Sequence, residues 1–153
     1  RDAQNARGWA RLGEVEAERG RARRAVAAWR RALDLDRRLA HEVHPRLESA
    51  WAKLGRSEEF GSYLRGLLRE RPGDAATRLA LARTLAEGGA TEEALAQIDQ
   101  LLERSPEDLR AHVLRGRVLL EAGRDGNAAK AFGGLLDVLE RRGLVAPPME
   151  GLE

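Results

Sequence analysis

No cysteine occurs among the 153 residues of the chain. Its absence excludes disulfide bonds and thiolate metal sites, and leaves nothing that argues for an oxidising compartment. Long apolar runs are also missing. None approaches the roughly 18 residues of a membrane-spanning helix, and the N-terminus lacks the basic and apolar segments of a signal peptide. We therefore expect the chain to be soluble.

Aromatic residues make up only 4% of the chain and β-branched residues are scarce, whereas charged residues reach 34%. Alanine, leucine, arginine and glutamate dominate the sequence. These residue types favour helices over strands. The length suits one domain with a sizeable core, so an all-α domain is expected.

Charge is unevenly distributed along the chain, although the net charge is only +2. Residues 1–40 contain eleven basic and six acidic residues, while the rest of the chain is slightly acidic. A basic segment can bind single-stranded nucleic acid or anionic lipid, but such runs more often form a solvated helix face. Nucleic acid binding through these N-terminal helices is therefore kept as an alternative only.

Four glycines recur at nearly constant spacing. Gly20, Gly55, Gly89 and Gly123 are separated by 35, 34 and 34 residues. Each lies between two stretches in which apolar residues repeat at helical spacing, so each is expected to be a turn between two helices. The predicted units are residues 6–40, 41–74, 75–108 and 109–142. The predicted helices are residues 3–19, 22–35, 40–54, 57–70, 75–87, 91–104, 108–121 and 125–140. Thr91 is expected to cap the sixth of these helices.

Residues 143–153 contain two successive prolines and no periodicity, so we expect a disordered tail. The final pair, Leu152-Glu153, resembles a cloning scar, and the sequence begins in mid-pattern at Arg1. An excised segment of a longer protein is therefore expected.

The period of 34 residues, with small residues where paired helices approach and proline after the second helix, resembles the tetratricopeptide repeat. In the first unit, the residue types that characterise the repeat occur at Trp9, Leu12, Gly13, Ala25, Trp29 and Ala32. The resemblance implies a superhelical array of about four repeats. Glu48 departs from the pattern, because the repeat has a small residue there.

The three tryptophans, Trp9, Trp29 and Trp51, occupy positions that the repeat uses for packing between helices. We therefore expect them in the core and not as stacking platforms for bases or ligands. His112 also stands alone at a core-type position, and is expected to be a packing residue.

His41, His44 and Glu48 could share one helix face, as metal ligands do. Their spacing is not the HExxH zinc pattern and no fourth ligand is evident, so we expect surface or partly buried histidines instead. The sequence shows neither a Ser/His/Asp or Cys/His set nor a glycine-rich phosphate loop. It therefore predicts no enzyme, no cofactor and no metal site.

The remaining candidate is a concave groove. In tetratricopeptide repeats the first helix of each pair lines the inner surface, and the resemblance implies which residues would do so here. They are Arg7, Ala10 and Glu14; Glu42, Ser49 and Lys53; Leu79 and Arg83; and Arg110, Val113 and Arg117. Ala10 and Glu14 stand where domains that bind chaperone tails have lysine and asparagine.

Arg83, Arg110 and Arg117 would form a basic patch in the C-terminal half of this groove. A guanidinium matches the geometry of a carboxylate, so an acidic or C-terminal peptide segment is the expected ligand. The alternative is that these arginines are simply solvated in an arginine-rich chain.

A narrower resemblance covers residues 8–139. The segments LDLDRRLAHEV (residues 33–43) and LGRSEEFGSYLRGLLRERPGD (residues 54–74) resemble the repeats of the lipopolysaccharide assembly protein B family. This resemblance implies a non-enzymatic adaptor with an N-terminal anchor in the bacterial inner membrane, cytoplasmic repeats and a C-terminal zinc module. Its implied partners are a membrane protease and the lipid A deacetylase.

No residue of the sequence matches that anchor or that zinc module, because the chain contains no CxxC pair. A scaffold in another bacterial envelope, secretion or peptidoglycan assembly is the alternative function of the same class.

Overall fold

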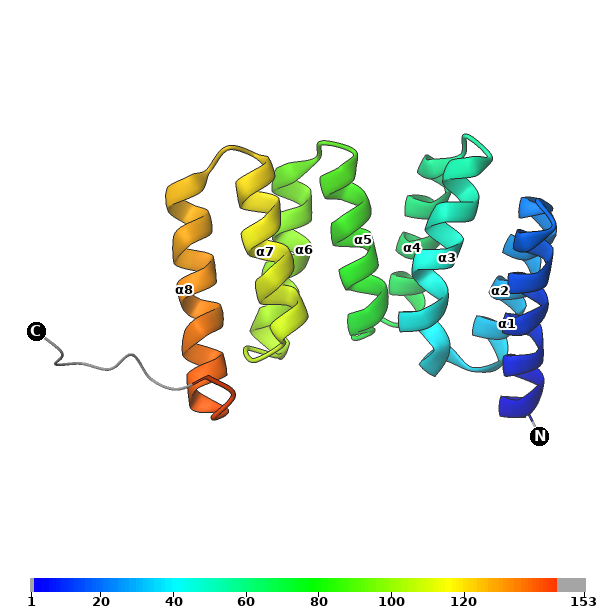
Figure 1. Ribbon diagram of the computed structural model, residues 1–153, viewed down its shortest axis with the longest axis horizontal. Helices are drawn as coiled ribbons and strands as arrows, with labels where there is room; N and C mark the ends of the chain where they lie inside the picture. Colours follow the sequence, from blue (N-terminus) through cyan, green and yellow to red (C-terminus); the bar gives the residue numbers. More distant parts are fainter. Residues whose placement is uncertain (1, 146–153) are drawn as a thin grey trace, which may run out of the picture. The chain divides into compact units, whose positions relative to one another are not determined.

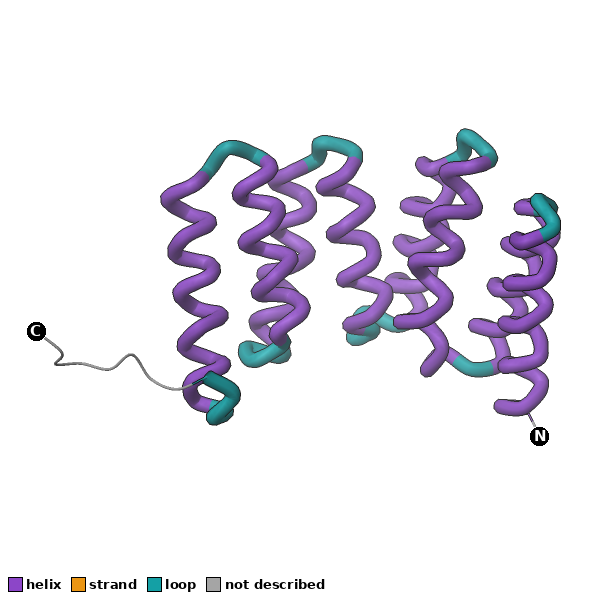
Figure 2. The backbone as a smooth tube through the Cα atoms, in the orientation of Figure 1, coloured by secondary structure: helices purple, strands orange, loops and turns teal. Residues whose placement is uncertain are grey.

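The structure is a computed structural model and describes residues 2–145. All regular structure in this range is helical (Figure 2). The helices, labelled in Figure 1, are α1 (Asp2–Glu18), α2 (Ala22–Leu35), the short 3₁₀ helix η1 (Arg37–Leu39), α3 (Ala40–Lys53), α4 (Ser57–Glu70), α5 (Ala75–Glu87), α6 (Thr91–Arg104), α7 (Leu109–Glu121) and α8 (Asp125–Arg141). None of these helices is long and apolar enough to cross a membrane.

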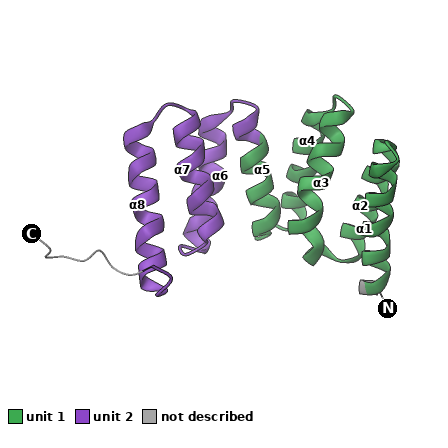
Figure 3. Cartoon of the chain, viewed as in Figure 1, with its two compact units in different colours: residues 1–84 green, residues 85–153 purple. Residues whose placement is uncertain are grey.

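The eight α-helices confirm the predicted all-α class and lie within one or two residues of the predicted boundaries. Only η1 was not predicted. The chain divides into two compact units, one ending at residue 84 and the other beginning at residue 85 (Figure 3). Unit 1 contains α1 to α4 and most of α5, and unit 2 contains the end of α5 and α6 to α8.

The four turn glycines adopt the left-handed conformation that the prediction requires, with φ between +68° and +80°. The amide after each glycine donates to the carbonyl five residues earlier. These bonds are Arg21 to Glu16, Arg56 to Trp51, Ala90 to Leu85 and Arg124 to Leu119, all 2.8 or 2.9 Å long. This is the Schellman arrangement, in which only glycine takes the left-handed position without strain.

A fifth such turn closes α8. Gly143 has φ +67°, and the amide of Leu144 donates to the carbonyl of Leu139 at 2.9 Å. Gly143 and Leu144, which the prediction assigned to the tail, take part in the turn that ends α8. The rest of that predicted tail, residues 146–153, lies outside the described residues.

The core of unit 1 contains two of the three tryptophans. Trp29 is 3% and Trp51 is 5% exposed, as expected. The Trp51 ring lies 5.5 Å from that of Phe60 and 5.4 Å from that of Tyr63, measured between centroids. Trp9 contradicts the prediction, since it is 40% exposed.

The one cap predicted above, at the start of α6, is not formed, although a different helix has a side-chain cap. Asp108 caps α7 by accepting from the amides of Arg110 and Ala111. Thr91 does not cap α6, because it is the first residue inside the helix and Ala90 occupies the N-cap position without a side-chain bond. Helical backbone geometry at Thr91 prevents the capping arrangement that the sequence suggested.

Candidate functional site

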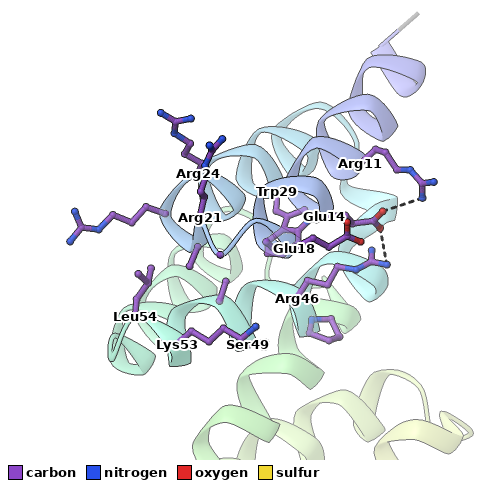
Figure 4. A pocket seen from close by; sticks show the side chains of 16 residues that line it. Arg11, Glu14, Glu18, Arg21, Arg24, Trp29, Arg46, Ser49, Lys53 and Leu54 are labelled. Atoms are coloured by element: carbon purple, nitrogen blue, oxygen red, sulfur yellow. Dashed lines mark hydrogen bonds and ion pairs between the residues drawn. The ribbon is translucent and has the colours of Figure 1, made fainter.

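An open pocket of about 1020 Å³ lies in unit 1 between the C-terminal half of α1, the first turn of α2 and α3 (Figure 4). It is lined by Arg11, Glu14, Ala17, Glu18, Gly20, Arg21, Ala22, Arg23, Arg24, Trp29, Pro45, Arg46, Ser49, Ala50, Lys53 and Leu54. We call it the α1–α3 pocket. Its size is at the upper end of the range typical of ligand sites, roughly 300–1,000 Å³.

Trp29 forms a fixed part of the pocket wall. Its indole Nε1–H donates to the backbone carbonyl of Ala10 at 3.1 Å, which ties α2 to α1. The ring lies against Gly13, where a Cβ atom would come within 2.4 Å of Nε1. The α1–α2 pair is therefore in very close contact, and this part of the pocket is preformed.

The pocket is strongly basic. Six of its lining residues are arginine or lysine and two, Glu14 and Glu18, are acidic. Glu14 already has two cationic partners, Arg46 at 2.9 Å and Arg11 at 3.2 Å (Figure 4). The site therefore carries uncompensated positive charge.

Three of these cations have no partner among residues 2–145. Arg23, Arg24 and Lys53 are exposed and form no ion pair with the described side chains. The N-cap residue of α2, Arg21, makes no capping bond, and the first turn of α2 holds no acidic residue. The partial positive charge of the helix N-terminus thus adds to the side-chain charges.

The structure brings the predicted groove residues of the first two repeats onto neighbouring hollows. Glu14, Ser49 and Lys53 line the α1–α3 pocket. Arg7 and Glu42 line an adjoining hollow of about 250 Å³ that shares Glu14 with it. Ala10 also touches this hollow but is only 6% exposed, so it contributes little surface.

Leu79 and Arg83, the predicted groove residues of α5, are both half-buried. Arg83 donates from Nη2 and Nε to the same oxygen of Glu48, Oε2, at 2.7 and 3.1 Å. Glu48 therefore has a structural role at the position where the repeat has a small residue: it neutralises Arg83 across α3 and α5.

Arg110, Val113 and Arg117 lie along α7 in unit 2, where Val113 is 48% exposed. Arg110 pairs with its own helix-capping residue, Asp108, at 3.4 Å, and Arg117 pairs with Glu121 at 3.5 Å. Each arginine of the predicted C-terminal patch, including Arg83, thus has a carboxylate partner. Uncompensated positive charge lies instead in the α1–α3 pocket, which was not predicted as a basic site from the sequence.

The Glu48–Arg83 pair should stabilise unit 1. We expect a double-mutant cycle with Glu48→Gln and Arg83→Gln to give a coupling energy of about 1 kcal/mol, because both side chains are half-buried and share two hydrogen bonds. The matched control is the exposed Arg117–Glu121 pair, for which about 0.3–0.5 kcal/mol is expected. Urea unfolding measures both, and equal coupling would contradict the proposed role of Glu48.

The histidines do not form the metal cluster that was considered. His44 is 2% exposed and its Nε2 lies 3.1 Å from Thr77 Oγ1, whereas His41 is exposed and Glu48 binds Arg83. The expectation of a surface or partly buried His44 is therefore wrong. Among the described residues, no group of three potential metal-binding side chains comes together.

His112 was predicted to be a packing residue in the core. It is instead half-buried, and its Nε2 lies 2.7 Å from the carbonyl oxygen of Pro106.

Comparison with known proteins agrees with this geometry. Residues 61–118 match the tetratricopeptide repeat family. The paired helices of the structure are consistent with an array of such repeats. The structure is similar to that of MamA, with a TM-score of 0.65 and 18% identity over 92% of this chain and 82% of MamA.

It is also similar to YrrB, described as a TPR protein with an unusual peptide-binding site, with a TM-score of 0.55 and 17% identity over 89% of this chain and 87% of YrrB. At these identities the likeness concerns the fold. No curated protein sequence matches the chain.

Proposed function

We propose that this tetratricopeptide repeat protein is a non-catalytic scaffold that binds an extended segment of a partner protein in the α1–α3 pocket. The observation that carries the proposal is the pocket itself: about 1020 Å³, open, and walled by helices that close packing holds in place. Tetratricopeptide repeats are used to bind proteins, and YrrB is described as having a peptide-binding site. The predicted groove residues Glu14, Ser49 and Lys53 line this pocket.

The buried polar groups of unit 1 support a structural use of these side chains over a catalytic one. His44 is bound to Thr77, which offers neither an acidic orienting group nor a second titratable partner. Glu16, the buried carboxylate of α1, lies 3.7 Å from Arg21. Both groups are engaged in packing between elements of the repeat.

The test is a peptide selection against the chain, followed by affinity measurement with a blocked pocket. Ser49 is exposed and lines the pocket, so Ser49→Trp should fill it and weaken the selected peptides by on the order of ten-fold or more. Ser62→Trp, at an exposed position of α4 outside the pocket, is the matched control and should leave the affinity unchanged. Equal affinities for the wild type and Ser49→Trp would place the binding site elsewhere.

We further propose, from the resemblance of residues 54–74 to the lipopolysaccharide assembly protein B repeats, that the partners are a bacterial membrane protease and the lipid A deacetylase, with the chain on the cytoplasmic side of the inner membrane. This segment forms the turn at Gly55 and helix α4. The purified deacetylase should bind the chain and lose affinity for Ser49→Trp. If neither enzyme binds, a scaffold of another envelope or secretion assembly is the function that remains.

A further inference from the structure

We propose that the α1–α3 pocket selects acidic peptide segments, with Arg24 and Lys53 as the two cations that pair with carboxylates of the ligand. This inference rests on the proposed scaffold function and adds the chemical class of the ligand. Arg24 comes from the first turn of α2 and Lys53 from the last turn of α3, so the two charges stand on different walls of one cavity. Neither has an ion-pair partner within residues 2–145.

The charge of the pocket is specific to the first repeat. The equivalent helices of the later repeats begin with acidic residues: α4 with Glu58 and Glu59, α6 with Glu92 and Glu93, and α8 with Asp125. Acidic residues at these positions stabilise a helix through its dipole. Helix α2 has Arg23 and Arg24 there instead, which sacrifices helix stability and concentrates positive charge beside the cavity.

The dimensions favour an extended peptide. Arg46 and Lys53 both line the pocket and are seven residues apart on α3, which is about 10 Å along a helix axis. Three residues of extended chain span about the same distance. Because Arg46 already binds Glu14 and Glu42, a ligand needs less rearrangement to pair with Lys53 and Arg24, which like Arg23 form no ion pair with the described side chains.

A polypeptide fits these observations better than a nucleic acid. Glu18 lies in the pocket, is exposed and has no cationic partner in the described part of the chain, so it would repel a phosphate backbone. The indole of Trp29 is 3% exposed and hydrogen-bonded, and so is not available for the base stacking that supports single-strand binding. An acidic peptide can place its carboxylates beside the cations and neutral residues beside Glu18.

The experiment measures fluorescence anisotropy of three labelled probes: a nonapeptide of alternating glutamate and serine, its lysine counterpart, and an oligothymidine of the same length. The glutamate peptide should bind, the lysine peptide should not, and binding should weaken as salt is raised. The double variant Arg24→Glu/Lys53→Glu should lower the affinity for the glutamate peptide by on the order of ten-fold. Glutamate at position 24 is favourable in the first turn of α2, whereas glutamate at position 53 is unfavourable in the last turn of α3. The two dipole effects offset each other, so the melting temperature of the double variant should stay close to that of the wild type.

The matched control is Arg31→Glu/Arg69→Glu, which makes the same change in charge at exposed positions of α2 and α4 outside the pocket. If both double variants lower the affinity for the glutamate peptide equally, the effect comes from net charge alone and the proposal is overturned. If the oligonucleotide binds more tightly than the glutamate peptide, and Arg24→Glu/Lys53→Glu abolishes that binding, the proposal is overturned in favour of a nucleic acid ligand. A further outcome is that the glutamate peptide shows no binding while peptides of another composition bind the wild type and do not bind Ser49→Trp. In that case the acidic preference is wrong and the scaffold function stands.

Discussion

Replacing Gly13 with alanine should lower the free energy of unfolding of unit 1 by about 2–3 kcal/mol. A Cβ at this position would lie 2.4 Å from Nε1 and 2.5 Å from Cδ1 of Trp29. The ring cannot easily move away, because it is 3% exposed and its Nε1–H is bonded to the carbonyl of Ala10. Urea unfolding followed by circular dichroism measures the loss.

The control for this change is Gly8→Ala on the same helix. No atom lies within 4 Å of a Cβ built at Gly8, so only the intrinsic helix propensity changes, and this variant should gain up to about 1 kcal/mol. If Gly13→Ala is as stable as Gly8→Ala, the close contact between α1 and α2 is not required for stability.

A smaller residue in place of Trp29 should restore part of the stability that Gly13→Ala loses. The same spacing of 16 residues separates Gly13 from Trp29, Gly116 from Phe132 and Ala82 from Ile98. At Gly116 a Cβ would meet the Phe132 ring at 2.4 Å, so the contact of the first repeat recurs in unit 2. In both observed contacts the glycine faces an aromatic ring, so an alanine at the glycine position needs a smaller residue opposite it. Gly13→Ala combined with Trp29→Ile should therefore be less destabilised than the sum of the single changes, by about 1–2 kcal/mol.

The spacing of the turn glycines predicts most of the fold because it has a local cause. Gly20 and its three equivalents each adopt a left-handed conformation that other residues avoid, so the sequence records the turn directly. The Gly13–Trp29 contact is similarly visible as a small residue paired with a large one. The exposure of Trp9 cannot be predicted in this way. Periodicity places a residue on the apolar face of a helix but does not show how much of that face a neighbouring helix covers.

The site was harder to predict because it depends on which charges find partners. The Arg83–Glu48 pair joins residues 35 positions apart, and nothing local in the sequence signals it. The groove positions Ser49 and Lys53 could be assigned from the repeat, but the basic pocket also needs Arg21, Arg23 and Arg24 from the turn and the start of α2. The signal that could have found it is the replacement of acidic by basic residues in the first turn of this one even-numbered helix.

His44 connects two helices of unit 1 through a buried polar contact. Its Nε2 lies 3.1 Å from Oγ1 of Thr77 on α5, and its Nδ1 has no hydrogen-bond partner within residues 2–145. Burial lowers the pKa of His44 from 6.5 to about 4, and the nearby Asp74 only partly offsets this effect. The ring is therefore neutral in the folded chain at pH 7, and charging it would place an imidazolium beside Phe60 without adequate partners.

This shift makes stability depend on pH. Because the folded-state pKa lies below the unfolded value, the unfolded chain takes up the proton first, and stability is lost as the pH falls from about 6.5 towards 4. At pH 4.5 the loss from His44 should be about 2–3 kcal/mol relative to pH 7. Urea unfolding at both pH values, for the wild type and for His44→Leu/Thr77→Val, measures it. The double variant removes both ends of the contact, so neither polar group is left buried alone.

The expected result is a difference of about 2–3 kcal/mol between the acid sensitivities of the wild type and the double variant, since the carboxylates contribute equally to both. His41→Leu is the control: His41 is exposed on the same helix, and its removal should leave most of the pH dependence in place. Equal acid sensitivity of the wild type and the double variant would mean that His44 is not the group responsible. Since Thr77 lies on α5 and His44 on α3, loss of this contact should appear first as weaker packing between these two helices of unit 1.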